Sequence, residues 1–431
     1  MTPTRETFGN IPFTSQLAFY ALALVAMGIF CWGVYRRWKL WQIGQPVGFR
    51  ELIAGNLLAV WEKIRPGARR VAIDAGAQQR VRGHGLGTVA HLSLYVGFMA
   101  LLAGTTLLEL DNILSHVSAA LKFHQGTYYV IYEYTLDILG LAFLAGTLFF
   151  CWRRLRKPAA LGHRASDWYV LLSFLAIGVT GYLVEALRIV WSQPTGLAAH
   201  CSPVGLWLAG CFSSFTVSEA RSAHFAVWWM HAFLVFGFIA SIPFTRLFHF
   251  IAGPLNIFLA KPGLGSLVPV SMEEVEQTER VGVSDIRHFS IQQLLSLDAC
   301  MECGRCEEVC PATATGKPLS PKRVVQDLKG LMEETAAGLA AGKKEFRALH
   351  EDTIKAETLW SCTACSACVD VCPVRIDQLG LIISMRRHLV AEGGLSGPAA
   401  TALRRMQSNA NPWGLPPAER ANWLDDLNTK S

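Results

Sequence analysis

The fold of the second half of the chain is decided by the stretch Cys300-Met-Glu-Cys303-Gly-Arg-Cys306-Glu-Glu-Val-Cys310-Pro311. The same pattern returns as Cys362-Thr-Ala-Cys365-Ser-Ala-Cys368-Val-Asp-Val-Cys372-Pro373. Both copies read C-x2-C-x2-C-x3-C-P, and together they hold eight of the 12 cysteines in the chain. The second half is therefore organised around two equivalent sets of thiols.

This spacing is that of bacterial ferredoxins, in which three close thiolates hold one [4Fe–4S] cluster and the fourth cysteine ligates the other cluster. Paired C-x2-C elements also bind zinc, but two complete copies with the terminal proline favour clusters. We predict that the first cluster is held by Cys300, Cys303, Cys306 and Cys372, and the second by Cys310, Cys362, Cys365 and Cys368.

Composition indicates that the rest of the chain is embedded in a membrane. Of the 431 residues, 52% are hydrophobic and 17% are charged, and the mean hydropathy is +0.30. These values exclude a disordered protein and an ordinary soluble enzyme. The net charge is +6, but residues 252–431 carry 19 Lys and Arg against 22 Asp and Glu, so a nucleic-acid partner is not expected.

Five apolar stretches are long enough to cross a hydrocarbon core of about 30 Å, which requires about 20 helical residues. They lie at about 15–35, 89–110, 127–152, 167–191 and 224–248. The loops 36–88 and 153–166 carry 15 Lys and Arg, whereas the N-terminus and the two other loops carry three. This bias predicts an outer N-terminus and a cytoplasmic cluster domain. Residues 49–64 have an amphipathic pattern, which predicts an interfacial helix.

Histidines at the helix ends are candidate ligands, because ionisable groups in lipid are commonly functional. His84 and His91 are seven residues apart, as are His224 and His231, and His249 lies eighteen residues after His231. These intervals are close to whole helical turns, so each set is predicted to share one face. Two antiparallel helices with facing histidines could hold haem b.

Depth favours His91 with His249 for an inner haem, because both lie near the inner boundary, and His84 is the substitute for His91. His231 is the candidate ligand of an outer haem, whose second ligand could be His224 or His124. That second haem could equally be absent. The alternative for each histidine is an interfacial or hydrogen-bonded position without a ligand role.

Charged residues also occur in the outer half of the bundle, at Asp137, Glu185 and Arg188. They either form a buried ion pair that fixes packing or provide a proton path to a quinone near the outer leaflet. Cys201 and Cys211 in an outer loop could form a disulfide in an oxidising compartment.

We therefore predict an all-α protein: a five-helix transmembrane cytochrome b bundle followed by a mainly helical cytoplasmic dicluster ferredoxin-like domain. The predicted domain boundaries are 1–250 for the haem b domain, 251–285 for a linker, 286–394 for the dicluster domain and 395–431 for an extended partner-docking tail. The clusters use all the cysteines of the second half. No catalytic residue is expected in the chain.

The membrane half resembles the cytochrome b subunit of respiratory nitrate reductases, including the spacing of His231 and His249. That family has another histidine ten residues after the first on its second helix, where this chain has Leu101. The whole layout resembles heterodisulfide-reductase-like iron–sulfur membrane proteins, which share the stretches Trp228–His231, Pro243–His249 and Thr180–Arg188.

The resemblance implies a respiratory electron-transfer subunit of the bacterial or archaeal inner membrane that connects a soluble cytoplasmic oxidoreductase, two [4Fe–4S] clusters, haem b and the quinone pool. Longer relatives continue into cysteine-rich CCG domains, so the soluble partner is expected to be a CCG-domain protein or a flavoprotein. One alternative is a quinol-driven donor to a CCG thiol/disulfide subunit. Another is a non-enzymatic redox sensor or scaffold.

Overall fold

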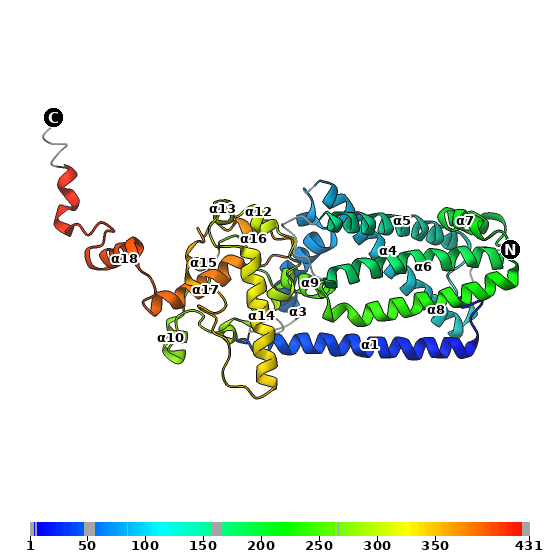
Figure 1. Cartoon of the computed structure of the whole chain (residues 1–431), viewed down its shortest axis with the longest axis horizontal. Helices are drawn as coiled ribbons and strands as arrows, with labels where there is room; N and C mark the ends of the chain where they lie inside the picture. The colour runs from blue at the N-terminus through cyan, green and yellow to red at the C-terminus, as the bar shows by residue number, and fades with distance from the viewer. Residues whose placement is uncertain are drawn as a thin grey trace.

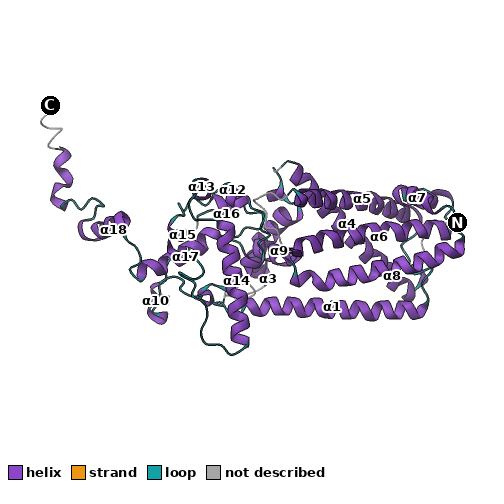
Figure 2. Cartoon of the chain, in the orientation of Figure 1, coloured by secondary structure: helices purple, strands orange, loops and turns teal. Residues whose placement is uncertain are grey.

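All regular elements in the part of the chain that the structure describes are helices. The computed structural model describes residues 4, 7–46, 57–83, 85–156, 165–261, 263–265 and 267–424. In these ranges the only β pairing consists of isolated bridges, and Figure 2 shows helices joined by loops. The predicted all-α fold is therefore confirmed. Of the predicted interfacial segment 49–64, residues 49–56 lie outside the described ranges, and the rest belongs to α3 (Leu57–Arg70).

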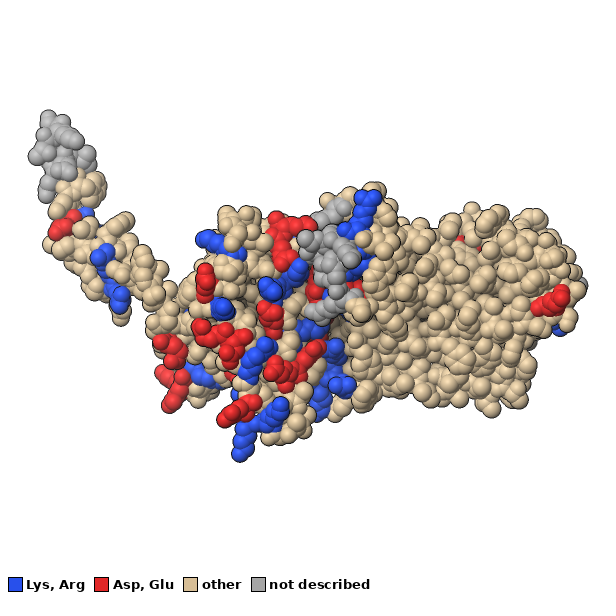
Figure 3. Space-filling view, viewed as in Figure 1, with Lys and Arg blue, Asp and Glu red and all other residues tan. Residues whose placement is uncertain are grey.

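The first half is a bundle of long helices that lie side by side in Figure 1. They are α1 (Phe13–Trp41), α4 (Leu86–Val117), α5 (Gly126–Leu155), α6 (Ala165–Ser192) and α8 (Val217–Ser241). Among the described residues these five helices are long and apolar enough to span a membrane. Figure 3 shows few charged side chains on this bundle, in contrast to the second half. The chain is a membrane protein.

Close contact between α4 and α5 depends on glycine. A Cβ atom on Gly97 would lie 2.6 Å from the carbonyl oxygen of Leu139, and one on Gly146 would lie 2.7 Å from that of Ala90. Small residues allow helix backbones in lipid to approach in this way. α6 packs against α8, and α8 against α1, which completes the bundle.

The last long helix ends earlier than predicted. α8 stops at Ser241 and is followed by two 3-10 turns, Ile242–Phe244 and Arg246–Phe248, before α9 (His249–Leu259) begins. Pro243 causes this break because it has no backbone N–H to donate to the preceding turn. The expectation of one helix over 224–248 was therefore wrong beyond Ser241, and His231 and His249 do not lie on one helix face.

The second half folds around three helices, α11 (Ile291–Asp298), α14 (Pro321–Ala340) and α17 (Gln378–Ala391). Buried side chains from them form a hydrophobic core, which also contains Trp41 of α1 and Phe248 and Ala252 of the α8–α9 region. The membrane bundle and the cysteine-rich half thus share a continuous core. The region predicted as a linker begins within α9, whose Ala252, Gly253, Asn256 and Ile257 are buried.

Shorter elements complete the chain. Around the cysteines lie α12 (Arg305–Glu308), α13 (Pro311–Ala314), α15 (Ala356–Trp360) and α16 (Ala367–Val371). Elsewhere lie α7 (Pro203–Ala209), α10 (Met272–Thr278), a π-helical turn at Val71–Gly76 and 3-10 turns at Gln79–Val81, Ala119–Leu121, Gly196–Ala199, Gly210–Phe212, Ile286–His288 and Pro417–Ala421.

The tail after residue 394 is not extended, contrary to expectation. It forms α18 (Gly397–Asn409), which projects away from the rest of the chain in Figure 1. Pro398 suits the first turn of a helix, and the alanines, leucine and arginines that follow are strong helix formers. After α18, the side-chain oxygen of Asn411 accepts hydrogen bonds from the backbone N–H groups of Gly414 (2.8 Å) and Leu415 (2.9 Å).

Candidate iron–sulfur and haem sites

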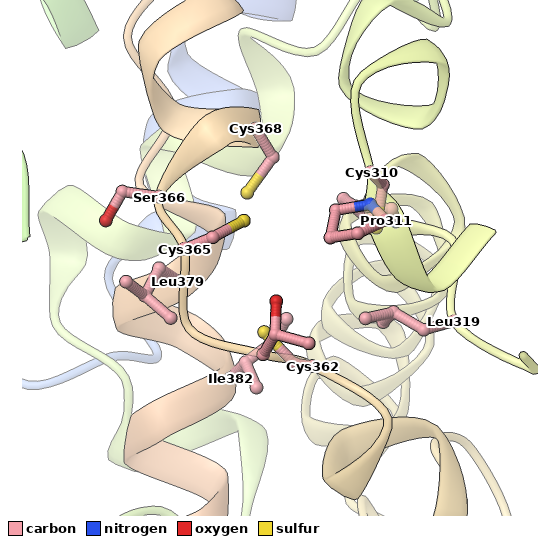
Figure 4. A pocket seen from close by; sticks show the side chains of 11 residues that line it. Cys310, Pro311, Leu319, Cys362, Cys365, Ser366, Cys368, Leu379 and Ile382 are labelled. Carbon is pink, nitrogen blue, oxygen red and sulfur yellow. The ribbon is translucent and has the colours of Figure 1, made fainter. Parts of the chain in front are cut away.

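Four cysteines from both motif copies surround one cavity. Cys362, Cys365 and Cys368 of the second copy lie on one side, and Cys310 of the first copy lies opposite (Figure 4). The cavity volume is ≈ 330 Å³, including the part that opens to solvent, and Leu319, Leu379 and Ile382 also line it. These are the four cysteines predicted to hold the second cluster, so the chain brings this set together.

The other four cysteines lie close together in the same way. Burial, with the nearby Cys303 and Cys300, raises the pKa of Cys372 to about 12. Burial and the nearby cysteines of its set also raise the pKa of Cys306. Because their pKa is raised, the thiols of Cys306 and Cys372 have to lose a proton when they bind iron. Cys372 is additionally held by a hydrogen bond from the backbone N–H of Ile376 to its sulfur (3.3 Å).

The two motif copies fold into the same loop. Glu302 and Ala364 occupy equivalent positions and have φ of +52° and +56°, and the next equivalent pair, Gly304 and Ser366, has φ of +82° and +63°. Three of these residues carry side chains in the left-handed region, which non-glycine residues adopt rarely. The identical cysteine spacing thus corresponds to a similar loop backbone. The helices that follow the two loops, α12 and α16, pack against each other.

The thiols fit clusters better than a single ion. Within the described ranges, no three His, Cys, Asp or Glu side chains converge closely enough to bind one metal ion. In a [4Fe–4S] cluster each thiolate binds a different iron, so four sulfurs should surround a space instead of one point. The arrangement in Figure 4 meets this requirement.

Two of the predicted haem ligands lie at the end of the bundle that adjoins the cysteine-rich half. His91 on α4 and His249 at the start of α9 are within electrostatic range of each other. The Nδ1–H of His249 donates to the carbonyl oxygen of Arg246 (2.9 Å), which leaves its Nε2 lone pair available. Nδ1 of His91 is buried without a hydrogen-bond partner. A metal-bound imidazole typically has one nitrogen hydrogen-bonded and the other on the metal. His249 therefore has the hydrogen bonding expected of a haem b ligand.

The other candidate histidines in the described ranges contact polar and aromatic neighbours. Nδ1 of His231 lies 2.8 Å from the hydroxyl of Thr180 on α6. His224 instead contacts the amide of Asn10 (3.3 Å) and the ring of Trp191. His84 lies outside the described residues, and His124 lies among the rings of Tyr128, Tyr129 and Tyr132.

The acidic residues at the other end of the bundle make defined polar contacts. Asp137 accepts hydrogen bonds from the backbone N–H groups of Val204 (2.7 Å) and Gly205 (3.1 Å) in the first turn of α7, so it caps that helix. Glu185 and Arg188 form a close ion pair, with Nη2 2.5 Å from Oε1, and Glu133 lies 3.8 Å from the same guanidinium. Cys201 is buried and Cys211 exposed, and both are free thiols.

Polar residues that the sequence pattern did not single out connect the bundle to the cysteine loops. Asp298, two residues before Cys300, accepts a hydrogen bond from the indole of Trp41 (2.9 Å) and pairs with Lys329 (2.9 Å). In the sequence, Asp298 stands out as a charged residue inside the apolar stretch before the first motif. Its partners could not be inferred, because Trp41 lies 257 residues away.

A second set of contacts joins both motif copies to one short turn. Arg305 donates to the carbonyl oxygens of Arg80 (2.9 Å) and Val81 (3.2 Å). Arg80 in turn donates to the carbonyl oxygens of Asp370 (2.6 Å) and Cys372 (3.2 Å). The turn just before α4 is thereby fixed against the cysteine loops.

Two known families match the two halves. Residues 78–264 match the family described as nitrate reductase gamma subunit, and residues 296–376 match the family described as 4Fe-4S dicluster domain. No solved structure matches the chain. The matches confirm the predicted order of a nitrate reductase gamma-like domain followed by a dicluster domain.

Several curated proteins are similar to the chain. The EtfAB:quinone oxidoreductase of Syntrophomonas wolfei is 31% identical over 98% of this chain and 61% of its own length. A probable membrane-anchored ferredoxin of Chromohalobacter salexigens is 30% identical over 95% of this chain and 58% of its own length. One polypeptide of the dihydromethanophenazine:CoB–CoM heterodisulfide reductase of Methanosarcina barkeri is 29% identical over 32% of this chain and 36% of its own length. The chain thus spans about three fifths of the first two relatives.

Proposed function

We propose that this membrane iron–sulfur electron-transfer subunit, in which a nitrate reductase gamma-like domain precedes a dicluster domain, passes electrons between a soluble cytoplasmic oxidoreductase and the quinone pool. The path runs through two [4Fe–4S] clusters and haem b. The similarity to a quinone oxidoreductase over 98% of the chain supports the quinone as the membrane-side substrate.

The observation that carries the proposal is the convergence of the first cysteine set and the inner histidines. Arg305, beside Cys306, is within electrostatic range of His91. On the other side, Asn256 of α9 donates to the carbonyl oxygen of Val374 (2.7 Å), two residues after Cys372. Residues from distant parts of the sequence thus meet where α4 and α9 present His91 and His249.

The protein residues supply ligands and an environment. When bound, the clusters and the haem accept and release single electrons, and their potentials depend on burial and on hydrogen bonds to their ligands. Burial of Cys310 and Cys372 excludes water from the thiols that join the two motif copies. The backbone N–H groups of Ile376 and Ala364 donate to the sulfurs of Cys372 (3.3 Å) and Cys362 (3.4 Å).

For the membrane-side reaction, Glu185 and Arg188 form a proton path together with Glu133. The single guanidinium of Arg188 faces two carboxylates, and Glu133 is the more distant of them at 3.8 Å. Asp137 holds α7 over this group, because its carboxylate accepts two hydrogen bonds from the first turn of that helix.

A second candidate function is electron donation to a thiol/disulfide subunit. The similarity of about a third of the chain to a heterodisulfide reductase subunit favours it. The two candidates share the cysteine and histidine sites and differ only in the soluble partner. Co-purification with a flavoprotein supports the first candidate, and co-purification with a CCG-domain polypeptide supports the second.

The test uses membranes that contain the full chain. A reduced water-soluble quinone analogue is added, and the absorbance of the haem α band is followed in time. We expect the band to appear with quinol and to disappear when oxidised quinone is added in excess. A haem that responds to dithionite but to neither quinone form would contradict the proposal.

A further inference from the structure

Arg246 lies at the point where the bundle meets the first cysteine loop. It opens the 3-10 turn Arg246–Phe248, which separates α8 from α9. Leu247 and Phe248, the next two residues, are buried, and the hydroxyl of Thr245 accepts a hydrogen bond from the N–H of Leu247 (3.3 Å). The turn is therefore fixed on both sides of the arginine.

The backbone and the side chain of Arg246 contact two different parts of the chain. Its carbonyl oxygen accepts the hydrogen bond from Nδ1 of His249 (2.9 Å). Its guanidinium lies 2.9 Å from the carboxylate of Glu302, which stands between Cys300 and Cys303. One residue thus connects the ring of the inner histidine with the loop of the first cysteine set.

The guanidinium is also anchored to the bundle. Its Nη1 lies 3.0 Å from Oδ1 of Asp167 on α6, and Oδ2 of Asp167 lies 2.9 Å from Arg154 on α5. The side chains of Arg246, Asp167 and Glu302 are only 15%, 4% and 8% exposed. The four charges alternate in sign and sum to zero, so the chain of ion pairs is neutral as a whole. Shielding from water makes each pair stronger than it would be at the surface.

We infer that Arg246 is a positioning residue that sets the placement of the first cysteine loop relative to His249, and so controls electron transfer between the two sites. The inference rests on the proposed function. Lysine is not an adequate replacement, because its single ammonium cannot span two carboxylates as the planar guanidinium does.

The experiment compares Arg246→Gln and Glu302→Gln in the purified full chain. Readouts are cluster and haem content, the electron paramagnetic resonance spectrum of the oxidised haem, and the rate of haem reduction after rapid reduction of the clusters. We expect both variants to retain their cofactors and to show a shifted haem spectrum. Transfer should slow severalfold, because the rate of electron tunnelling falls with the distance between the two redox centres and the remaining ion pairs limit the displacement of the loop.

Two comparisons separate positioning from general damage. The double variant should be no slower than the more affected single variant, because both changes break the same contact. Arg287→Gln is the matched control, since it removes the more exposed Arg287–Asp285 pair (2.7 Å) in the same half of the chain, and it should change neither the haem spectrum nor the rate. Arg246→Lys should fall between the wild type and Arg246→Gln.

The inference is overturned if Arg246→Gln and Glu302→Gln bind their cofactors and keep the wild-type haem spectrum and transfer rate, or if their effects add in the double variant. If Arg246→Gln fails to fold, the haem spectrum and transfer rate of Glu302→Gln test the inference. A wild-type chain whose haem does not respond to quinol would refute the proposed function, but the spectral comparison of the variants would still test the role of Arg246.

Discussion

Replacing Asp298 by asparagine should loosen the attachment of the dicluster half to the membrane bundle. The Asp298 side chain is fully buried, and its carboxylate accepts from Trp41 (2.9 Å) and pairs with Lys329 (2.9 Å) and Arg37 (3.4 Å). Asparagine keeps the shape and one acceptor oxygen for the indole. It removes the negative charge, however, and places an amide donor near two cations.

The structure limits the size of the effect. Removing one partner of a fully buried ion pair costs about 3–5 kcal/mol. Lys329 is 22% exposed and can recover part of its hydration, and Arg37 keeps its pair with Glu333 (2.6 Å). We therefore expect a loss of about 2–3 kcal/mol, which corresponds to a factor of about 30–150 in the local opening equilibrium.

Hydrogen exchange of the backbone amides in α11 and α14 measures this opening directly, because it reports local unfolding below the global transition. Both helices should exchange faster by that factor in Asp298→Asn. Glu334→Gln on α14 is the control: it removes a surface pair with Arg347 (3.3 Å) and should change the opening free energy by less than about 0.5 kcal/mol. Wild-type exchange in Asp298→Asn would refute the reasoning.

The remaining predictions concern the ligands and the topology. Cys372→Ser should alter the paramagnetic resonance signal of the cluster held by the first motif, and Cys310→Ser that of the other cluster; the reverse assignment would contradict the exchange of the fourth ligand between copies. His249→Ala should remove the inner haem band, whereas His224→Ala, which disrupts a contact with Asn10, should leave it unchanged. The exposed Cys211 should react with a membrane-impermeant maleimide in intact spheroplasts, and labelling only after lysis would contradict an outer location of its loop.

Features with a local cause were predictable from the sequence. The five apolar helices follow from length and hydropathy, which need no knowledge of neighbouring segments. The break at Pro243 and the helix from Gly397 also had local signals, namely a proline inside an apolar run and a proline followed by helix-forming residues. The apolar run around Pro243 led us to predict one continuous helix there. The Pro/Asn-rich composition of the tail led us to predict an extended segment in place of α18.

Features that depend on distant partners were not predictable. Asp137 reads as an intramembrane acid, but its role depends on α7, which folds back over it 67 residues later in the sequence. The pairing of Arg246 with Glu302 likewise requires the cysteine loop to dock beneath the bundle. The grouping of cysteines is an exception, because the motif itself relates the fourth ligand of each copy to the other copy.

If one chain holds iron–sulfur clusters at its cysteine loops and haem at His91 and His249, the purified protein should contain both cofactors. The most direct measurement is a dithionite-minus-oxidised visible spectrum of the purified protein, together with its iron and acid-labile sulfide content. We expect a b-type α band, about eight cluster irons and one or two haem irons per chain. A protein with intact clusters but without that band would contradict the proposed connection between the two halves.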